Sequence, residues 1–305
     1  MLTLGHDRGV LPLGRPMPRT VYVLALASAF CSACATIFIR QGLRGRGPYT
    51  GFWINLVVGT VGLWAAVLLT GGFGRLSATG IAFFVLAGLI GTVAGRLLRF
   101  VSIEKVGAST AAALINLHPL FATGVAILLL GERVTAPILA GTVVIVLGTI
   151  LLSIGGRRGG IRPWQITLPL LSAACFGVVA VLRKLGLAET GAVLGSAINV
   201  TTALVAFTAF LLASGDWEAM ACRGRSLVYF VAAGAAENGA VFMNVVALSL
   251  GTVSVVAPLY GTAPIFVLFL SFFFLRGVET LSRRLVLGTL LIVLGVYLIT
   301  ALSER

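Results

Sequence analysis

Long apolar runs separated by short polar connections make up most of this chain. Each run holds roughly 20 residues and would span about 30 Å as a helix, which is enough to cross the hydrocarbon core of a bilayer. The connections carry turn and charge signals, such as the segment from Gly155 to Gly160. The pattern predicts an all-α membrane protein with ten transmembrane helices. We place them near residues 20–40, 50–70, 79–101, 107–130, 134–154, 164–183, 192–213, 226–248, 252–275 and 283–302.

The composition excludes an ordinary soluble domain. The chain is 59% hydrophobic and 10% charged, with a mean hydropathy of +1.09, whereas soluble proteins carry about 25% charged residues. A net charge of +13 would suggest nucleic acid as the partner of a soluble protein. Here the arginines lie mostly in short connections and at helix ends, so we expect the lipid bilayer as a partner and no nucleic acid.

An internal repeat divides the chain into two similar halves. The stretch GTVVIVLG (Gly141 to Gly148) returns as GTLLIVLG (Gly288 to Gly295), 147 residues later. Further matches follow in the same order at offsets of 144 to 147. They include Glu132 with Glu279, Pro119 with Pro264, Gly88 with Gly234, Asn55 with Asn199, and Ser28 with Ser172.

The repeat sets the predicted organisation. We expect a tail at 1–19, a first repeat at 20–155, a linker at 156–163 and a second repeat at 164–302. Because each repeat has an odd number of spans, the second repeat must enter the membrane from the opposite side. Inverted repeats of this kind are typical of alternating-access transporters, with a substrate site near the bilayer midplane.

The stretch from Ala87 to Leu152 resembles the EamA repeat of the drug/metabolite transporter superfamily. Its marks are a third helix rich in small residues, Gly-Ala-Ser opening a fourth helix, a proline within that helix, Gly-Glu-Arg ending it, and a glycine-containing fifth helix. The second copy keeps Pro264, Glu279 and Gly288 but has a looser ending, Gly-Val-Glu. The resemblance implies a secondary transporter with two inverted five-helix halves, commonly an exporter of amino acids, other metabolites or drugs.

Lysines and arginines give a different orientation from the one that the resemblance implies. Of the 22, eight lie in the termini and even-numbered connections, and 14 lie in the odd-numbered connections and adjoining helix ends. The positive-inside rule therefore favours outside termini. The resemblance implies cytoplasmic termini, and we expect that orientation in a bacterial cell inner membrane.

Two charged residues inside predicted spans are the leading candidates for a substrate-binding site. A charge at the centre of a transmembrane helix costs roughly 2.5 to 3.5 kcal/mol on insertion scales and is commonly functional. Glu237 lies midway along the eighth span and would bind a substrate ammonium group or a coupled proton. Arg96 lies deep in the third span and would bind a carboxylate or phosphate, while Arg99 is expected to reach the lipid headgroups. For Glu237 the alternative is a structural carboxylate hydrogen-bonded to Asn or Ser neighbours. For Arg96 the alternatives are reaching the headgroups or a structural pairing with Glu237.

Polar groups beside a proline mark the fourth span. Pro119 has no N–H, so the carbonyl of Ile115 loses its helical partner and needs another. Asn116 and His118 are therefore candidate binding residues, and Pro264 is expected to shape the ninth span in the same way. Helix packing alone, with His118 as a structural histidine, is the alternative. The remaining candidates are Asn238, Asn55, Asn199 and Tyr260.

The repeated glycines are expected to pack helices rather than to touch substrate. Seven residues place Gly141 and Gly148 on one helix face, and Gly288 and Gly295 on another. In lipid, small residues let helix backbones approach closely. We therefore predict that the fifth and tenth helices pack together through these four positions.

Two other classes of function remain as alternatives to a transporter of a small-molecule substrate such as an amino acid or organic anion. A membrane-embedded enzyme or flippase would act on lipid-linked substrates, but the sequence offers no metal-ligand cluster and no nucleophile with a base at helical spacing. We predict no cofactor and no metal. A passive channel is the second alternative, which saturable, gradient-coupled counterflow would exclude.

Overall fold

The computed structural model describes residues 18–43, 45–71, 77–106, 114–132, 134–153, 163–274 and 283–301. Every regular element in these ranges is a helix, which confirms the all-α prediction, and every predicted window overlaps one of them. The elements are α1 (Arg19–Gly42), α2 (Pro48–Leu69), α3 (Ala78–Ala87), η1 (Gly88–Gly95), α4 (Arg96–Val106), α6 (His118–Leu130), α7 (Ala136–Ser153), α8 (Pro163–Leu187), α9 (Ala192–Ser214), η2 (Trp217–Met220), α10 (Arg225–Leu250), α11 (Val253–Tyr260), α12 (Ala263–Phe274) and α13 (Arg283–Ala301).

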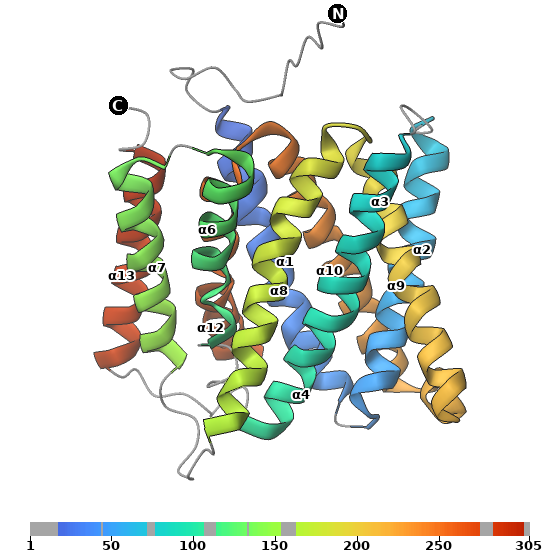
Figure 1. Ribbon diagram of the computed structural model, residues 1–305. Coiled ribbons are helices and arrows are strands. Elements are labelled where there is room, and N and C mark those ends of the chain that lie inside the picture. The colour runs from blue at the N-terminus through green and yellow to red at the C-terminus, as the bar shows by residue number, and fades with distance from the viewer. Residues whose placement is uncertain are drawn as a thin grey trace, which may run out of the picture.

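Within the described part of the chain, six helices are long and apolar enough to cross a membrane. They are α1, α2, the continuous segment Ala78–Arg99, most of α8, α9 and α10. Shorter apolar helices lie at His118–Leu130, Ala136–Leu151, Val253–Val267 and Leu290–Ile299. The chain is therefore a multi-pass membrane protein, whose helices stand roughly upright beside one another in Figure 1.

Proline and glycine set several helix ends. Pro48 begins α2, where its missing N–H would have had no helical partner. Gly131 and Gly215 follow α6 and α9 with φ values of 65° and 72°, a left-handed conformation that suits glycine. Each of these glycines therefore ends its helix with a turn of the chain.

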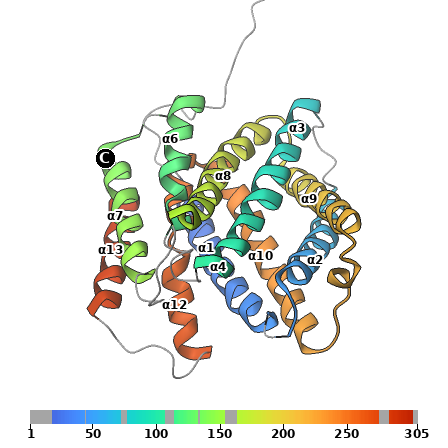
Figure 2. The ribbon, with the colours of Figure 1, turned by 60° about the horizontal axis from the view of Figure 1, so that its bottom comes forward.

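The repeated octapeptides lie against each other in the structure. Helices α7 and α13 stand side by side at one edge of the bundle (Figures 1 and 2). A Cβ built on Gly141 would lie 2.7 Å from the carbonyl oxygen of Gly295, and one built on Gly148 would lie 2.7 Å from that of Gly288. The two helices are thus antiparallel, and each octapeptide contacts the other through equivalent glycines.

Two phenylalanines fix helices of one half against the other half in matching ways. Each ring packs against two glycines. A Cβ built on either glycine would lie less than 3.0 Å from the nearest atom of the ring. Phe230 of α10 fills the space beside α1 and α2, and Phe84 of α3 fills the space beside α8 and α9. The contacted glycines are Gly42 and Gly51 for Phe230, and Gly186 and Gly195 for Phe84.

The fourth and ninth predicted spans are each interrupted at equivalent places. The first interruption is the turn at Asn116 and Leu117, before α6, and the second is the turn at Gly261 and Thr262, between α11 and α12. The two turns are 145 residues apart, the offset that also relates Pro119 to Pro264. The proline therefore follows the break in each half, where its lack of an N–H costs the new helix little.

Candidate functional site

The two charged residues predicted for the site form an ion pair inside the bundle. Arg96 Nη2 lies 3.7 Å from Glu237 Oε1, and the two residues are only 7% and 3% exposed. Glu237 lies midway along α10, whereas Arg96 begins α4. The pair therefore joins the two halves, and Glu237 Oε2 is buried with no hydrogen-bond partner.

Asn55 and Asn238 complete the polar surroundings of this pair. Arg96 Nη1 donates to Asn55 Oδ1 at 3.1 Å. Asn238 Nδ2 donates to the Asn55 carbonyl at 2.9 Å, and lies 3.2 Å from Asn55 Oδ1 and 2.8 Å from the Gly234 carbonyl. Four of the predicted binding residues therefore form one buried network between α2, α4 and α10.

Asn199 lies in a second network rather than against Asn55. Its Nδ2 donates to Thr92 Oγ1 at 3.0 Å, and its Oδ1 accepts from Arg183 Nη2 at 3.5 Å. Thr92 is on the same continuous helical segment as Arg96, so the two networks are neighbours along it.

Arg183 is a charged residue of the interior at the last position of the predicted sixth span. The predicted sixth helix ended at residue 183, whereas α8 continues to Leu187. The side chain is half-buried, and its Nε has no hydrogen-bond partner. Arg99, which is expected to reach the headgroups, donates to Thr36 of α1 at 3.3 Å.

The segment directly before Arg96 contains an extra residue. Gly88–Gly95 forms a π-helix, in which hydrogen bonds span five residues instead of four. Where this segment begins, Gly88 matches Gly234 at an offset of 146, and beyond it Pro119 matches Pro264 at 145. The first half therefore has one residue more than the second half between these points. A single inserted residue is what a π-turn accommodates within an α-helix.

Two equivalent hydrogen bonds locate this extra residue. Ser28 Oγ donates to the carbonyl of Ala240 at 2.7 Å, and its counterpart Ser172 donates to the carbonyl of Gly95 at 2.8 Å. Ala240 and Gly95 are already 145 residues apart. The offset therefore changes from 146 to 145 between Gly88 and Gly95, which places the extra residue within η1, before Arg96.

His118 satisfies the carbonyl that Pro119 leaves without a partner. Its Nδ1 lies 3.2 Å from the carbonyl oxygen of Ile115. A carbonyl only accepts hydrogen bonds, so the proton is assigned to Nδ1 and Nε2 is an acceptor. Nε2 is buried without a partner. His118 thus supports the helix break while presenting an open acceptor.

Tyr260 lies beside His118, whereas two other candidates are less connected. The rings of Tyr260 and His118 are 6.1 Å apart and nearly perpendicular, and Tyr260 Oη donates to Ser32 Oγ at 3.2 Å. Asn116 lies in the turn before α6, and no described hydrogen bond joins its side chain to the networks above. Pro264 belongs to α12, but its side chain lies outside the described part of the chain.

A separate set of charges holds one end of the bundle together. Glu132 accepts from the backbone N–H groups of Val253 and Ser254 at 2.9 and 3.0 Å, and from Ser254 Oγ at 2.7 Å. Its carboxylate therefore caps the N-terminus of α11, where negative charge is favourable. Lys184 Nζ donates to the carbonyls of Leu248 and Gly251 at 2.7 Å each, at the end of α10.

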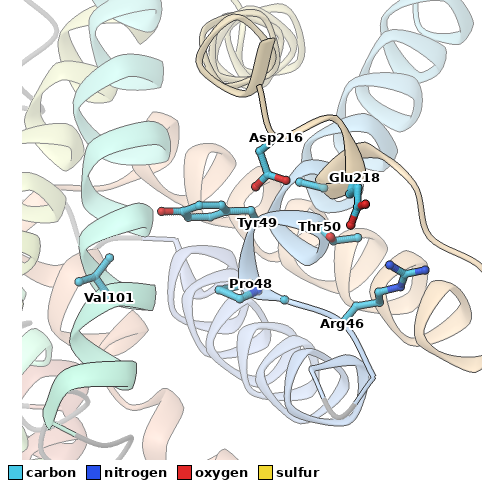
Figure 3. A pocket seen from close by; sticks show the side chains of 9 residues that line it. Arg46, Pro48, Tyr49, Thr50, Val101, Asp216 and Glu218 are labelled. Carbon is cyan, nitrogen blue, oxygen red and sulfur yellow. The ribbon is translucent and has the colours of Figure 1, made fainter. Parts of the chain in front are cut away.

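One pocket, lined by described residues, contains none of the predicted binding residues. It has a volume of about 400 Å³ and lies where α2 begins, beside the connection after α9 and Val101 of α4 (Figure 3). Arg46 and Tyr49 line one side, and Asp216 and Glu218 line the other. The central networks are buried in this conformation and are distinct from this peripheral pocket.

Comparison with known proteins identifies two matching segments and a shared fold. A family model described as "EamA-like transporter family" matches residues 19–154 and again 163–301. A solved structure described only as "Crystal structure of protein" has a TM-score of 0.78 at 18% identity, covering 94% of this chain and 98% of its own. At this identity the likeness supports the fold alone. A search of curated proteins found no match.

Proposed function

Because the chain belongs to the EamA-like transporter family, we propose that it is a secondary transporter that moves a small metabolite, such as an amino acid or organic anion, by alternating access. The proposal includes ten membrane crossings in two inverted halves. It also places the protein in a bacterial inner membrane, with cytoplasmic termini and export as the direction of transport.

The buried Arg96–Glu237 pair is the observation that carries this proposal. Removing two charges from water costs several kcal/mol for each ion, and their attraction alone offsets that cost only when the remaining polar atoms are satisfied. Glu237 Oε2 has no such partner. A membrane protein that retains an incompletely satisfied ion pair at the contact of its two halves has the chemistry of a binding site.

The matched contacts of the two halves support alternating access. Phe230 of the second half contacts the first half in the way that Phe84 of the first half contacts the second. The glycines of α7 and α13 contact each other reciprocally as well. A pair of similar half-structures can rock against each other around a site between them. Glu237 and Arg96 join the halves, so this motion would expose them to each side in turn.

Glu237 is also the proposed site of proton coupling. A carboxylate paired with Arg96 at 3.7 Å is neutralised when it takes up a proton, which releases the arginine. The proton would bind Glu237 and the substrate would bind the released Arg96, so both would act on the same buried pair. This arrangement would couple transport to the proton gradient without any metal or cofactor.

Counterflow in proteoliposomes tests the proposed function. Vesicles containing the purified protein are preloaded with a pooled metabolite mixture, and uptake of labelled members is followed with and without a pH gradient. We expect saturable exchange that Glu237→Gln uncouples from the pH gradient. The exposed carboxylate Glu189 offers a matched control, since Glu189→Gln should retain coupled exchange. Linear, non-saturable flux would instead indicate a channel.

A further inference from the structure

Positive charge exceeds negative charge inside the described part of the bundle. Three arginine side chains, Arg96, Arg99 and Arg183, are buried or half-buried within the spans, against one carboxylate, Glu237. Half-buried Lys184 and Glu132 at the end of the bundle are equal and opposite in charge, so they do not change this difference. Three positive charges less one negative charge leave an excess of two. Of the three arginines, Arg96 is the one that forms an ion pair with Glu237 among the described residues.

The other two arginines are held by neutral groups. Arg99 donates to the hydroxyl of Thr36, and Arg183 donates to the amide oxygen of Asn199 at 3.5 Å, which is the upper limit of a hydrogen bond. Hydroxyl and amide oxygens orient a guanidinium but do not neutralise it. The Nε of Arg183 is buried with no partner at all, so this side chain retains an unused donor.

The three arginines act on a common region. Arg183 donates to Asn199, and Asn199 donates to Thr92, which lies one turn before Arg96 on the same helical segment. Arg99 lies one turn after Arg96 on that segment and donates to Thr36 of α1. The three side chains therefore lie along neighbouring turns of one continuous segment. In a low-dielectric interior, like charges that share a region repel strongly and attract an anion strongly.

We propose that the site takes a small organic dianion, carrying two carboxylates or a phosphate monoester, and that Arg183 and Arg99 supply its charge recognition together with Arg96. This inference rests on the proposed function only in taking the central networks as the transport site. A dianion neutralises the excess of two charges, whereas a zwitterion such as an amino acid adds no net charge. Guanidinium groups bind carboxylate and phosphate oxygens through paired N–H donors, which suits either source of the charge.

Glu237 has a defined part in this proposal. In the substrate-free protein it occupies Arg96, so it competes with the incoming anion. Its removal should therefore strengthen anion binding. If Glu237 instead bound a substrate ammonium group, its removal would weaken binding of the zwitterion. The two readings predict opposite effects from the same substitution, Glu237→Gln.

A panel of molecules matched in size but not in charge tests the proposal. The purified protein in nanodiscs is titrated with succinate (a dianion), succinamate (a monoanion) and 4-aminobutyrate (a zwitterion), and with glycerol 3-phosphate against glycerol. Binding is read as thermal stabilisation. We expect succinate or glycerol 3-phosphate to bind at least about tenfold more tightly than the less charged partner molecule, and the better of the two dianions identifies the source of the charge.

Arginine variants then assign the recognition to the proposed residues. Arg183→Gln and Arg99→Gln should each weaken dianion binding roughly ten- to a hundredfold, and Glu237→Gln should strengthen it. Arg183→Lys keeps the charge, so it should recover a large part of the loss. Arg46→Gln removes an arginine from the peripheral pocket and should leave binding unchanged.

The outcomes separate this inference from the proposed function. Equal or tighter binding of 4-aminobutyrate, or dianion binding that survives both Arg183→Gln and Arg99→Gln, overturns the dianion assignment even if counterflow is robust. Tight dianion binding without saturable counterflow overturns the transporter and leaves the assignment standing. Loss of dianion binding in a folded Glu237→Gln variant also overturns the assignment.

Discussion

The Arg96–Glu237 pair should respond unequally to the loss of each partner. At 3.7 Å, and with an effective dielectric constant of about 20, the attraction between the two charges is about 4.5 kcal/mol. Glu237→Gln removes this attraction and leaves Arg96, Arg99 and Arg183 with no carboxylate among them. Arg96→Gln removes the same attraction but leaves Glu237 in an interior that still holds Arg99 and Arg183.

We therefore expect Glu237→Gln to lower the free energy of unfolding by about 3 to 5 kcal/mol, the cost of breaking a buried ion pair. Arg96→Gln should cost clearly less, because it reduces the excess positive charge where Glu237→Gln increases it. Equilibrium unfolding in mixed micelles of increasing SDS content measures both values. Arg96→Lys serves as the charge-retaining control and should fall between Arg96→Gln and the unchanged protein.

The inequality makes the reasoning refutable. Suppose that Arg96→Gln lowers the free energy of unfolding by as much as Glu237→Gln, or by more. The interior then does not carry an excess of positive charge. A double variant completes the cycle: the coupling energy between the two positions should be at least about 1 kcal/mol, as is usual for residues in direct contact. A coupling near zero would show that the pair contributes no attraction.

Two further substitutions probe the frame that holds the site. Gly51→Ala places a methyl group 2.5 Å from the ring of Phe230 and should destabilise the protein by about 1 to 3 kcal/mol, whereas Gly62→Ala on the same helix meets no atom within 4 Å and should be neutral or slightly stabilising in the same unfolding assay. Glu132→Gln weakens the cap of α11 by about 1 kcal/mol and should increase hydrogen exchange at the N-terminus of that helix; unchanged exchange there would show that the carboxylate does not hold it.

Much of the helical frame follows from apolar length and the internal repeat. Windows at 20–40 and 192–213 lie within α1 and α9, because runs of about 20 apolar residues bounded by proline, glycine or arginine leave few alternatives. The sixth window ended too early. Arg183 and Lys184 look like a polar connection, but each finds a polar partner in the fold, Asn199 for the arginine and two carbonyls for the lysine. Such partners depend on tertiary contacts that hydropathy does not describe.

The candidate site was predictable in its members but not in its arrangement. Buried charges are rare in apolar helices, so Arg96 and Glu237 stand out without any structure. That they meet each other depends on the facing directions of two helices from different halves. The position of Arg183 inside the bundle depends on the continuation of α8 past it to Leu187, which hydropathy does not indicate. The π-segment did leave a trace in the sequence, as the change in repeat offset from 146 to 145.

This trace gives a prediction about deletions. If η1 contains one residue beyond the α-helical frame, then removing that residue should let Gly88–Gly95 close into an ordinary helix while the flanking helices keep their positions. Deletion of Ala94 should therefore preserve the hydrogen bond from Ser172 to the backbone of this helix and leave Arg96 facing Glu237. We expect the deletion variant to fold and to retain at least part of its ligand-induced stabilisation.

The same deletion in the matching helix should be far more damaging. Helix α10 is a continuous α-helix at the equivalent place, and each residue of an α-helix turns the chain by about 100°. Deletion of Ala235 must therefore rotate the part of α10 that follows it, which moves Glu237 away from Arg96, or the part that precedes it, which moves Phe230 from its packing position. Expression, size-exclusion profile and thermal stability of the two deletion variants compare them directly. If the loss of Ala94 is as disruptive as the loss of Ala235, the π-turn is a required part of the third span and not an inserted residue within a shared helical frame.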